Sequence, residues 1–352
     1  MMDFSKKEQI QTAGDKAIQT QMSDFKNCNV TINSSELIRS IATEVCSKEL
    51  LNIYRTCTHD ALEIARIRDQ MFAQTFIPRL EKIESAMDAL RDPSFQYMIQ
   101  EARETAAKTD KCSNLELLSE LLICHIEKGK NKKVDSGINR AIKIVDEVDI
   151  DSLCALTVIC ALHNIAPLTG NIQKGFSILD QLYGSILDTE LPKENDWIDQ
   201  LNVLGAINIL PGRFLKLDEF LGDVYDGYFC VGIKQDSAEH KESLKILAEN
   251  DDEELLLVEN ELIDGYLRLN VVQLCSLDEK YKPIINLYTK DSHLMKEAKT
   301  NCMKIWDSYK NLNTIRTWFE SIKIWFRINS VGKALAQTNA KRCYKDFPDI
   351  IK

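Results

Sequence analysis

The feature that most constrains the fold is a long stretch without helix-breaking residues. Residues 34–77 contain neither Gly nor Pro, the two residues that most often interrupt helices. Apolar side chains recur in this stretch at helical spacing, as at Leu37, Ile41 and Val45. The pattern predicts one very long helix, or two nearly continuous helices, over residues 35–77. Helices of such length often drive self-association.

The remainder of the chain repeats this helical signature. Only 13 Gly and 7 Pro occur in 352 residues, which disfavours a turn-rich β-fold. Short connections separate the predicted helices, as is typical of antiparallel neighbours. These helices cover residues 92–108, 114–128, 136–148, 151–165, 173–187, 196–210, 253–274, 291–309 and 313–337, with a shorter one after Asp278. The sequence therefore predicts an all-α, multi-helix array.

Residues 1–33 differ from the rest of the chain. An Ile-Gln-Thr unit occurs twice, and apolar and polar residues alternate again at 28–33, a pattern that predicts half-buried strands. Because this extended, Gln-rich leader has too few apolar side chains for a core of its own, we expect it to pair with copies in other subunits of a homo-oligomer. The residues expected at that contact are Ile10, Gln11, Ile18, Gln19, Val30 and Ile32. The alternatives are a leader that packs on the helical body and a disordered leader.

We divide the chain into three segments. They are the leader at residues 1–33, an N-terminal helical domain with a long first helix at 34–210, and a C-terminal helical subdomain at 211–352. The boundary is placed at Pro211-Gly212, which is expected to end the preceding helix. Shortly after it, residues 222–234 are rich in β-favouring side chains around Asp226-Gly227. That segment predicts a small hairpin.

The last predicted helix, at 313–337, combines aromatic and basic residues. Trp318 and Trp325 fall seven residues apart, so both are expected on one helix face. A core helix that closes the bundle explains this pattern, and it predicts that both indoles are buried. The alternative is an amphipathic helix that contacts a membrane or a protein partner through Trp318, Trp325 and Arg327.

Charge is distributed unevenly along the chain. The net charge is −10, and residues 290–352 hold 13 Lys or Arg against 6 Asp or Glu. That tail therefore carries +7, and the rest of the chain carries −17, since −10 − 7 = −17. The acidic body disfavours nucleic acid as a partner, whereas the tail suits an acidic surface.

The cysteines and the hydropathy indicate the compartment. Eleven Cys are scattered without a CxxC pair, and an odd number cannot pair completely within one chain. Reduced thiols in a soluble, cytoplasmic protein are the expected state. No apolar signal region opens the sequence, and the most apolar run, residues 153–165, is too short to cross a bilayer.

No catalytic or cofactor-binding motif is found. Phosphate-loop, dinucleotide, zinc-protease and hydrolase signatures are absent, and none of the five His has a partner at zinc spacing. We assign no catalytic, cofactor-binding or metal-ligating residue and expect no cofactor. Three functions stay open. They are non-enzymatic assembly or sensing through residues 8–33 and 35–77, membrane perturbation by the last helix, and an enzyme with an unrecognised site near Tyr225 to Tyr228.

Several segments resemble a known family. The Gln-rich segment QTAGDKAIQTQ is followed by a run that ends VTIN and by SSELIRSIATEVCSKEL, and later by LRDPSFQYMIQEA and LLSELLICHIEK. Over residues 8–165 this order resembles an uncharacterised bacterial family of helical proteins that carry such a leader. Lys16 and Ala17 stand where the family pattern has small polar residues. The resemblance implies a link to anti-phage defence and implies no catalytic residues.

The leader hypothesis predicts the outcome of a double substitution. Replacing both Ile10 and Ile18 with Asp should disperse the assembly, because like charges would be crowded together where copies stack. Light scattering should show a lower mass, while circular dichroism and the thermal midpoint of the helical body stay unchanged. A double variant as large as the parent would instead leave the helices of residues 35–77 as the interface.

Overall fold

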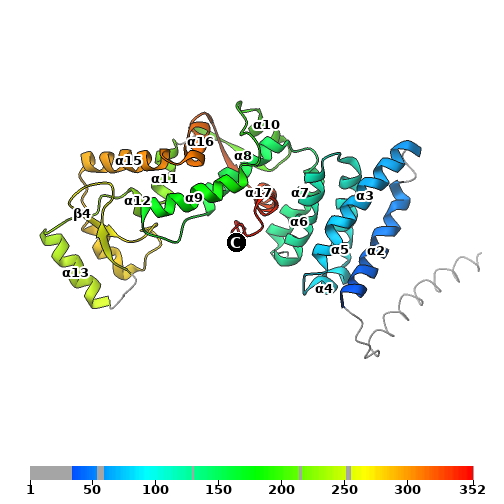
Figure 1. The fold of residues 1–352 in the computed structure, drawn as a ribbon, viewed down its shortest axis with the longest axis horizontal. Coiled ribbons are helices and arrows are strands. Elements are labelled where there is room, and N and C mark those ends of the chain that lie inside the picture. Colours follow the sequence, from blue (N-terminus) through cyan, green and yellow to red (C-terminus); the bar gives the residue numbers. More distant parts are fainter. Residues whose placement is uncertain (1–33, 54–58, 129–130, 214–215, 251–254, 352) are drawn as a thin grey trace, which may run out of the picture.

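The computed structural model describes residues 34–53, 59–128, 131–213, 216–250 and 255–351. It is mainly α-helical, and its elements form an elongated array (Figure 1). The all-α prediction is therefore confirmed. The leader, with Ile10, Gln11, Ile18, Gln19, Val30 and Ile32, lies outside the described residues.

The first half of the chain forms successive helices. They are α2 (Ser34–Ile53), α3 (His59–Leu80), α4 (Ala86–Arg91), α5 (Pro93–Lys108), α6 (Cys112–Lys128), α7 (Lys132–Ile144), α8 (Ile150–Asn164), α9 (Ile172–Ile186) and α10 (Asp196–Val203). The helix predicted over residues 92–108 is confirmed as α5. Asp92 caps it, with Pro93 at the first position, because the Asp92 side chain accepts a hydrogen bond of 2.8 Å from the Ser94 amide.

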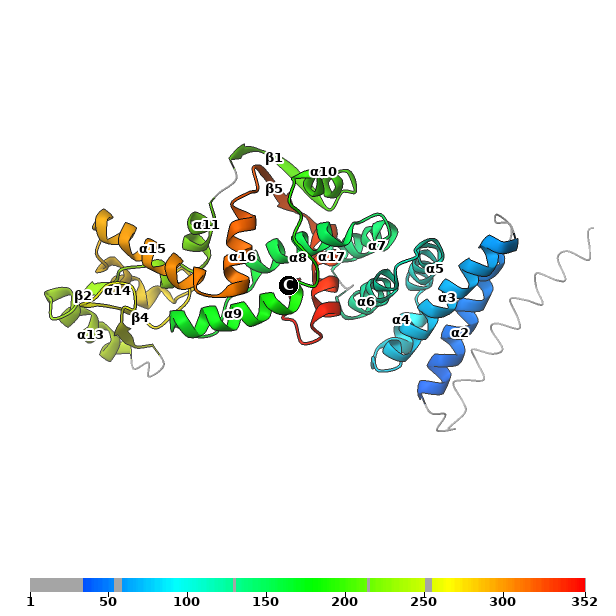
Figure 2. The same ribbon diagram turned by 45° about the horizontal axis from the view of Figure 1, so that its top comes forward.

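Of the two arrangements predicted for residues 35–77, two helices form and the single long helix is wrong. Helices α2 and α3 pack side by side (Figures 1 and 2), and Arg39 near the start of α2 forms an ion pair of 3.0 Å with Glu81 just beyond α3. Each helix buries its own apolar stripe, represented by Ile38 on α2 and Phe72 on α3. Because helical periodicity continues through both helices, it does not reveal that the chain reverses between them.

A buried ion pair fixes α3 against α5. Arg103 donates two hydrogen bonds of 2.6 Å to the carboxylate of Asp69, and both side chains are almost completely buried. A bidentate pair of this kind holds the two helices in one register, because each partner would be an isolated buried charge without the other.

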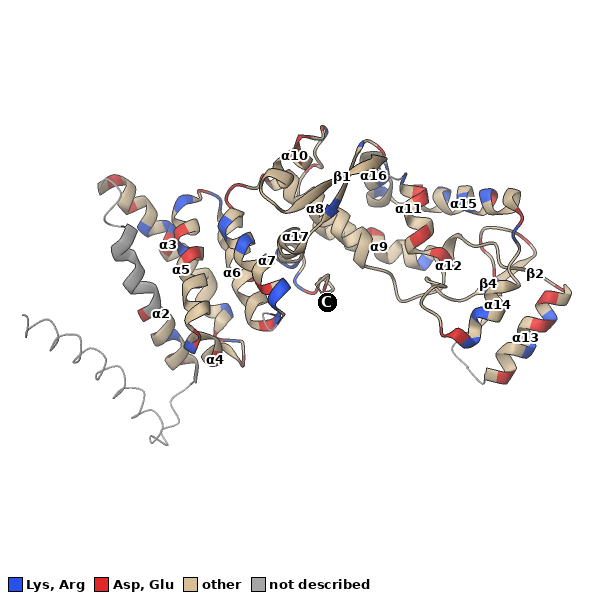
Figure 3. Ribbon diagram, turned by 180° about the vertical axis from the view of Figure 1, so that it is seen from behind, with Lys and Arg blue, Asp and Glu red and all other residues tan. Residues whose placement is uncertain are grey.

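Helix α8 lies at the centre of the array. Every residue from Ser152 to Leu162 is buried, and only Asp151 near its start is charged, whereas α13 (Ala238–Asn250) carries acidic and basic residues along its length (Figure 3). The burial comes largely from the C-terminal helix α17 (Ser330–Cys343), which packs against α6, α7 and α8. Between α17 and α8, Asn339 donates a hydrogen bond of 3.0 Å to Thr157.

Two predicted helices, at 196–210 and 313–337, are partly wrong. Strand β1 (Ile207–Arg213) pairs antiparallel with strand β5 (Ile324–Ile328), so that Ile209 faces Phe326 (Figure 2). The predicted last helix is therefore split into α16 (Lys310–Phe319), β5 and α17. Neither strand has a neighbour close in sequence, so only the tertiary fold supplies its hydrogen-bonding partner.

The hairpin expected at residues 222–234 does not form. That segment contains the end of α11 (Leu217–Val224), the short helix α12 (Asp226–Phe229) and strand β2 (Ile233–Lys234). Asp226 does not lie in a turn, because its carboxylate accepts hydrogen bonds from the amides of Leu274 at 2.6 Å and Cys275 at 3.1 Å. Its role is to hold the chain at residues 274–275.

A second small sheet replaces the helix predicted at 253–274. Strands β3 (Leu257–Glu259) and β4 (Tyr266–Leu269) form with β2 an antiparallel sheet in the order β2-β4-β3. The remaining elements are η1 (Glu279–Tyr281), α14 (Lys282–Asn286) and α15 (Ser292–Asp307). The short helix after Asp278 and the helix over 291–309 are thus confirmed.

The C-terminal part of the chain returns to the first half. Strand β5 and helix α17 pack against β1 and α6 to α8, so residues 324–343 complete the core of residues 34–210. A domain boundary at residue 211 stays a prediction. Pro211 and Gly212 lie within β1, where the pairing register shifts between Ile209 and Arg213.

The return of α17 depends on a close backbone approach at Gly332. A Cβ atom at this position would lie 2.3 Å from the carbonyl oxygen of Ala206. Gly332→Ala should therefore lower the free energy of unfolding by ~1–3 kcal/mol, as overpacking does. Gly222→Ala is the matched control, because a Cβ there meets nothing within 4 Å. Urea denaturation that ranks both variants equally would contradict this account.

Candidate functional site

Two adjoining cavities lie where the C-terminal segment returns. The larger, about 430 Å³, is lined by Ile159, Cys160, His163, Asn164, Leu210, Phe220, Phe319, Trp325, Phe326, Arg327, Ile328 and Lys333. The smaller, about 360 Å³, is lined by Asn131, Lys133, Val134, Arg327, Ile328, Asn329, Ser330, Lys333 and Ile351. We call them the aromatic cavity and the basic cavity. Arg327, Ile328 and Lys333 line both cavities, so the two cavities lie side by side.

Strand β5 brings an aromatic and a basic side chain to the aromatic cavity. Residues two apart in a strand lie on the same face, so Trp325 and Arg327 point to one side. Phe326 is buried, and its ring stands edge-on to Trp197 with ring centroids 5.5 Å apart. Burial of Phe326 thus fixes the orientation of the strand and, through it, the positions of Trp325 and Arg327.

Helix α8 contributes a histidine to the opposite wall. The ring of His163 lies 4.6 Å from that of Phe220 on α11, and its Nδ1 lies 2.8 Å from the Ile159 carbonyl oxygen. This distance assigns the proton to Nδ1. His163 is exposed by surface area, yet the protein atoms crowded around its ring lower its pKa, with a smaller contribution from the charge of Lys333. The imidazole is therefore neutral at pH 7.

Cys160, His163 and Asn164 are the three residue types that make up a Cys-His-Asn catalytic site, in which the thiol is the nucleophile. However, burial raises the pKa of the Cys160 thiol to about 12, so the sulfur is protonated at neutral pH and unreactive. Asn164 donates a hydrogen bond of 2.7 Å to the Cys160 carbonyl oxygen, which serves the end of α8. The arrangement suits binding better than nucleophilic catalysis.

The charge of the two cavities is of one sign. Lys133, Arg327 and Lys333 line them, and no carboxylate side chain is among their lining residues. None of the three cations forms an ion pair within the part of the chain that the structure describes. A third cavity, beside α10, contrasts with them, because Asp149, Asp151, Glu190, Glu194 and Asp196 line it together with Lys193. The basic charge is thus a local property of a chain with a net charge of −10.

The structure separates the two tryptophans that the sequence analysis placed on one helix face. Trp318 lies on α16 and is buried as predicted, with 7% of its surface exposed, and its Nε1 donates a hydrogen bond of 3.0 Å to Pro192. Trp325 lies on β5 and is half-buried. The shared helix face is therefore wrong, whereas Trp325 and Arg327 do meet at one cavity.

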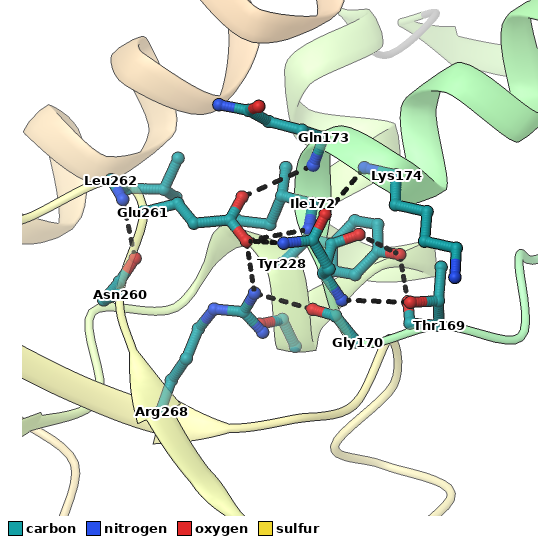
Figure 4. Close-up of polar contacts among 12 residues, drawn as sticks. Thr169, Gly170, Ile172, Gln173, Lys174, Tyr228, Asn260, Glu261, Leu262 and Arg268 are labelled. Carbon is teal, nitrogen blue, oxygen red and sulfur yellow. Dashed lines mark hydrogen bonds and ion pairs between the residues drawn. The ribbon is translucent and has the colours of Figure 1, made fainter.

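The tyrosines near the third hypothetical site serve the fold. The Tyr225 hydroxyl donates to the Ile165 carbonyl at 2.8 Å, and the Tyr228 hydroxyl donates to the Thr169 carbonyl (Figure 4). Burial raises the pKa of both phenols. Neither phenol is therefore prepared to give up a proton in a reaction at neutral pH.

A polar network beside Tyr228 joins the β2-β4-β3 sheet to α9 (Figure 4). Arg268 of β4 is fully buried and donates a hydrogen bond of 2.6 Å to the Gly170 carbonyl. The carboxylate of Glu261 lies 3.9 Å from the Arg268 guanidinium. It also accepts hydrogen bonds from the Asn171 side chain at 2.5 Å and the Ile172 amide at 3.3 Å, at the start of α9. The network positions these elements and caps the helix.

Two further searches bear on function. Within the described ranges, no three His, Cys, Asp or Glu side chains are grouped as metal ligands. Among the helices that the structure describes, none is both long enough and apolar enough to cross a membrane.

A protein-family model matches residues 33–350. The chain belongs to this family. Its description, a "-like" designation, states no activity, substrate or partner and shows no link to defence. The match includes every residue that lines the aromatic cavity and every residue that lines the basic cavity except Ile351. No curated protein and no solved structure matches the chain.

Sequence reasoning did not single out Lys133, His163, Phe220 or Lys333 as site residues. The β-favouring residues Ile324, Trp325, Phe326 and Ile328 were a local signal for β5, but the helical periodicity around them obscured it. The others come from α7, α8, α11 and α17, whose proximity no local pattern reveals.

The polar network predicts a measurable effect of removing Glu261. Glu261→Ala removes the carboxylate beside Arg268 and the acceptor at the start of α9. Because Glu261 is exposed and Arg268 keeps its hydrogen bond to Gly170, the free energy of unfolding should fall by ~1–2 kcal/mol. Glu259→Ala, two residues away and exposed, is the control and should change stability by less than about 0.5 kcal/mol. Equal denaturation midpoints for the two variants would show that the network does not hold the sheet.

Proposed function

We propose that this protein is a non-enzymatic sensing protein that binds a small molecule in the aromatic cavity. The observation that carries the proposal is the convergence of Trp325, Phe220 and His163 from three separate elements on one cavity of about 430 Å³. Small-molecule sites typically have ~300–1,000 Å³, apolar and aromatic walls and a few polar groups. The protonated Cys160 thiol disfavours a thiolate nucleophile at this cavity and is compatible with binding.

The place of the cavity supports a sensing role. Its walls come from α8 in the first half and from β5 and α17 in the returning C-terminal segment. A ligand that contacts both walls stabilises their packing by mass action. Occupancy is thereby coupled to the attachment of residues 324–343 to the central helix.

Self-association is the second part of the proposal. Ile64, Ile67 and Met71 on α3 are all exposed, and their spacing places them along one helix face. This stripe supports assembly through the first helices, beside the leader. The setting that we propose is the cytoplasm, and the family resemblance implies anti-phage defence.

Membrane perturbation by the C-terminal segment finds less support. That hypothesis requires a continuous amphipathic helix with Trp318, Trp325 and Arg327 available to lipid. Trp318 is buried against Trp197, with ring centroids 5.8 Å apart, and Trp325 lies on a strand. The apolar face of the segment is thus used within the protein.

Binding of an uncharged fluorescent dye, phenylnaphthylamine, tests the proposal on the full chain. The dye should fluoresce on binding to the parent protein. Trp325→Ala should weaken this binding about tenfold, because it removes roughly 1.5 kcal/mol of apolar contact. Leu168→Ala is the control, because Leu168 is exposed and lines neither cavity. Equal affinity for the dye in all three proteins would contradict a binding site in the aromatic cavity.

A further inference from the structure

We propose that the two cavities together bind a phosphorylated aromatic compound. The aromatic ring would lie in the aromatic cavity, and the phosphate would lie in the basic cavity among Lys133, Arg327 and Lys333. This inference rests on the proposed function, because it takes the aromatic cavity to be a binding site and names the chemistry of what binds there.

The position of the three cations points to an anion at the junction. Arg327 and Lys333 line both cavities, and Lys133 lines the basic cavity from α7. Other cations nearby are neutralised, since Lys128 and Lys341 contact Asp349 at 2.7 and 3.2 Å. Lys133, Arg327 and Lys333 have no such partner within the described ranges. Lys133 and Arg327 are exposed to solvent and Lys333 is half-buried, so all three are accessible to an anion that enters the hollow, and its charge would complement theirs.

Side chains, and not a helix terminus, supply this positive charge. Helix α17 begins at the basic cavity, but the Asn329 side chain already accepts hydrogen bonds from the amides of Val331 at 2.9 Å and Gly332 at 3.2 Å. The anion would therefore be held by an ammonium from α7, an ammonium from α17 and the guanidinium of β5. Because these groups belong to three elements, their spacing is set by the fold.

The number and kind of cations favour phosphate over a carboxylate. A phosphomonoester carries close to two negative charges at neutral pH and three acceptor oxygens. Arg327 offers paired N–H donors that match two such oxygens, and each Lys offers a compact charge. A carboxylate, with a single charge, would leave two of the three cations unneutralised.

The aromatic cavity suits a flat ring beside that phosphate. Trp325 and Phe220 present rings to the cavity, and the neutral His163 ring lies 4.6 Å from Phe220. Offset or edge-to-face contacts between aromatic rings add ~0.5–1.5 kcal/mol to their burial. A ring held there and a phosphate held by Arg327 and Lys333 are adjacent, because those two residues line both cavities.

Calorimetric titration of the full chain at low salt tests the inference. The probes are phenyl phosphate, adenosine 5′-monophosphate, adenosine and inorganic phosphate. At least one phosphorylated aromatic should bind at least tenfold more tightly than both adenosine and inorganic phosphate. Tighter binding of adenosine 5′-monophosphate would assign a nucleotide, and tighter binding of phenyl phosphate would assign a smaller phosphorylated ring. Binding of neither phosphorylated aromatic above these references would overturn the inference.

Variants separate this inference from the proposed function. Lys333→Gln and Lys133→Gln should each weaken the preferred phosphorylated probe about tenfold and leave phenylnaphthylamine binding unchanged. Lys290→Gln, an exposed lysine that lines neither cavity, is the control and should leave both affinities unchanged. If the dye binds at Trp325 but phosphate adds no affinity, only the phosphate assignment fails. If neither binds, the proposed function fails with it.

Discussion

The pairing of β5 with β1 is the interaction on which the rest of the structure depends. It brings residues 324–328 back to residues 207–213, and α17 then follows directly into the groove of α6, α7 and α8. Because α8 is apolar along nearly its whole length, it needs cover on several faces, and α17 provides it. The close approach at Gly332 and the cap at Asn329 are local requirements of this return.

Both cavities are consequences of that return. The aromatic cavity is lined by α8, which is fixed by burial, and by the β5–α17 segment, whereas the basic cavity is lined by the start of α7 and that same segment. The strand sets Trp325 and Arg327 on one side, and the first turn of α17 adds Lys333. At the far end of the array, the Arg268–Glu261 network holds the β2-β4-β3 sheet on α9. Two different interactions, strand pairing and a buried polar network, thus anchor the C-terminal half at separate points.

The chemistry of the site follows from burial and charge together. Burial keeps the Cys160 thiol protonated, and the protein atoms around the His163 ring lower the pKa of the imidazole although its surface is exposed. Lys128 and Lys341 are neutralised by ion pairs with Asp349. Among the described residues, the cations that line the two cavities have no such ion pair. The aromatic walls and these cations are the features on which our proposal of a ligand-binding site rests.

The sequence by itself determined the helical class, because Gly and Pro are scarce and apolar residues recur at helical spacing. It also located single helices such as α5, α8 and α15, whose caps and periodicity are local. It placed Trp325 and Arg327 in a shared role, but on a helix. Only the tertiary structure decided the reversal between α2 and α3, the strands β1 and β5, and the meeting of Lys133, His163, Phe220 and Lys333. Those outcomes depend on contacts between residues far apart in the chain. The local preference of a short apolar run does not determine which distant segment it will pack against or pair with.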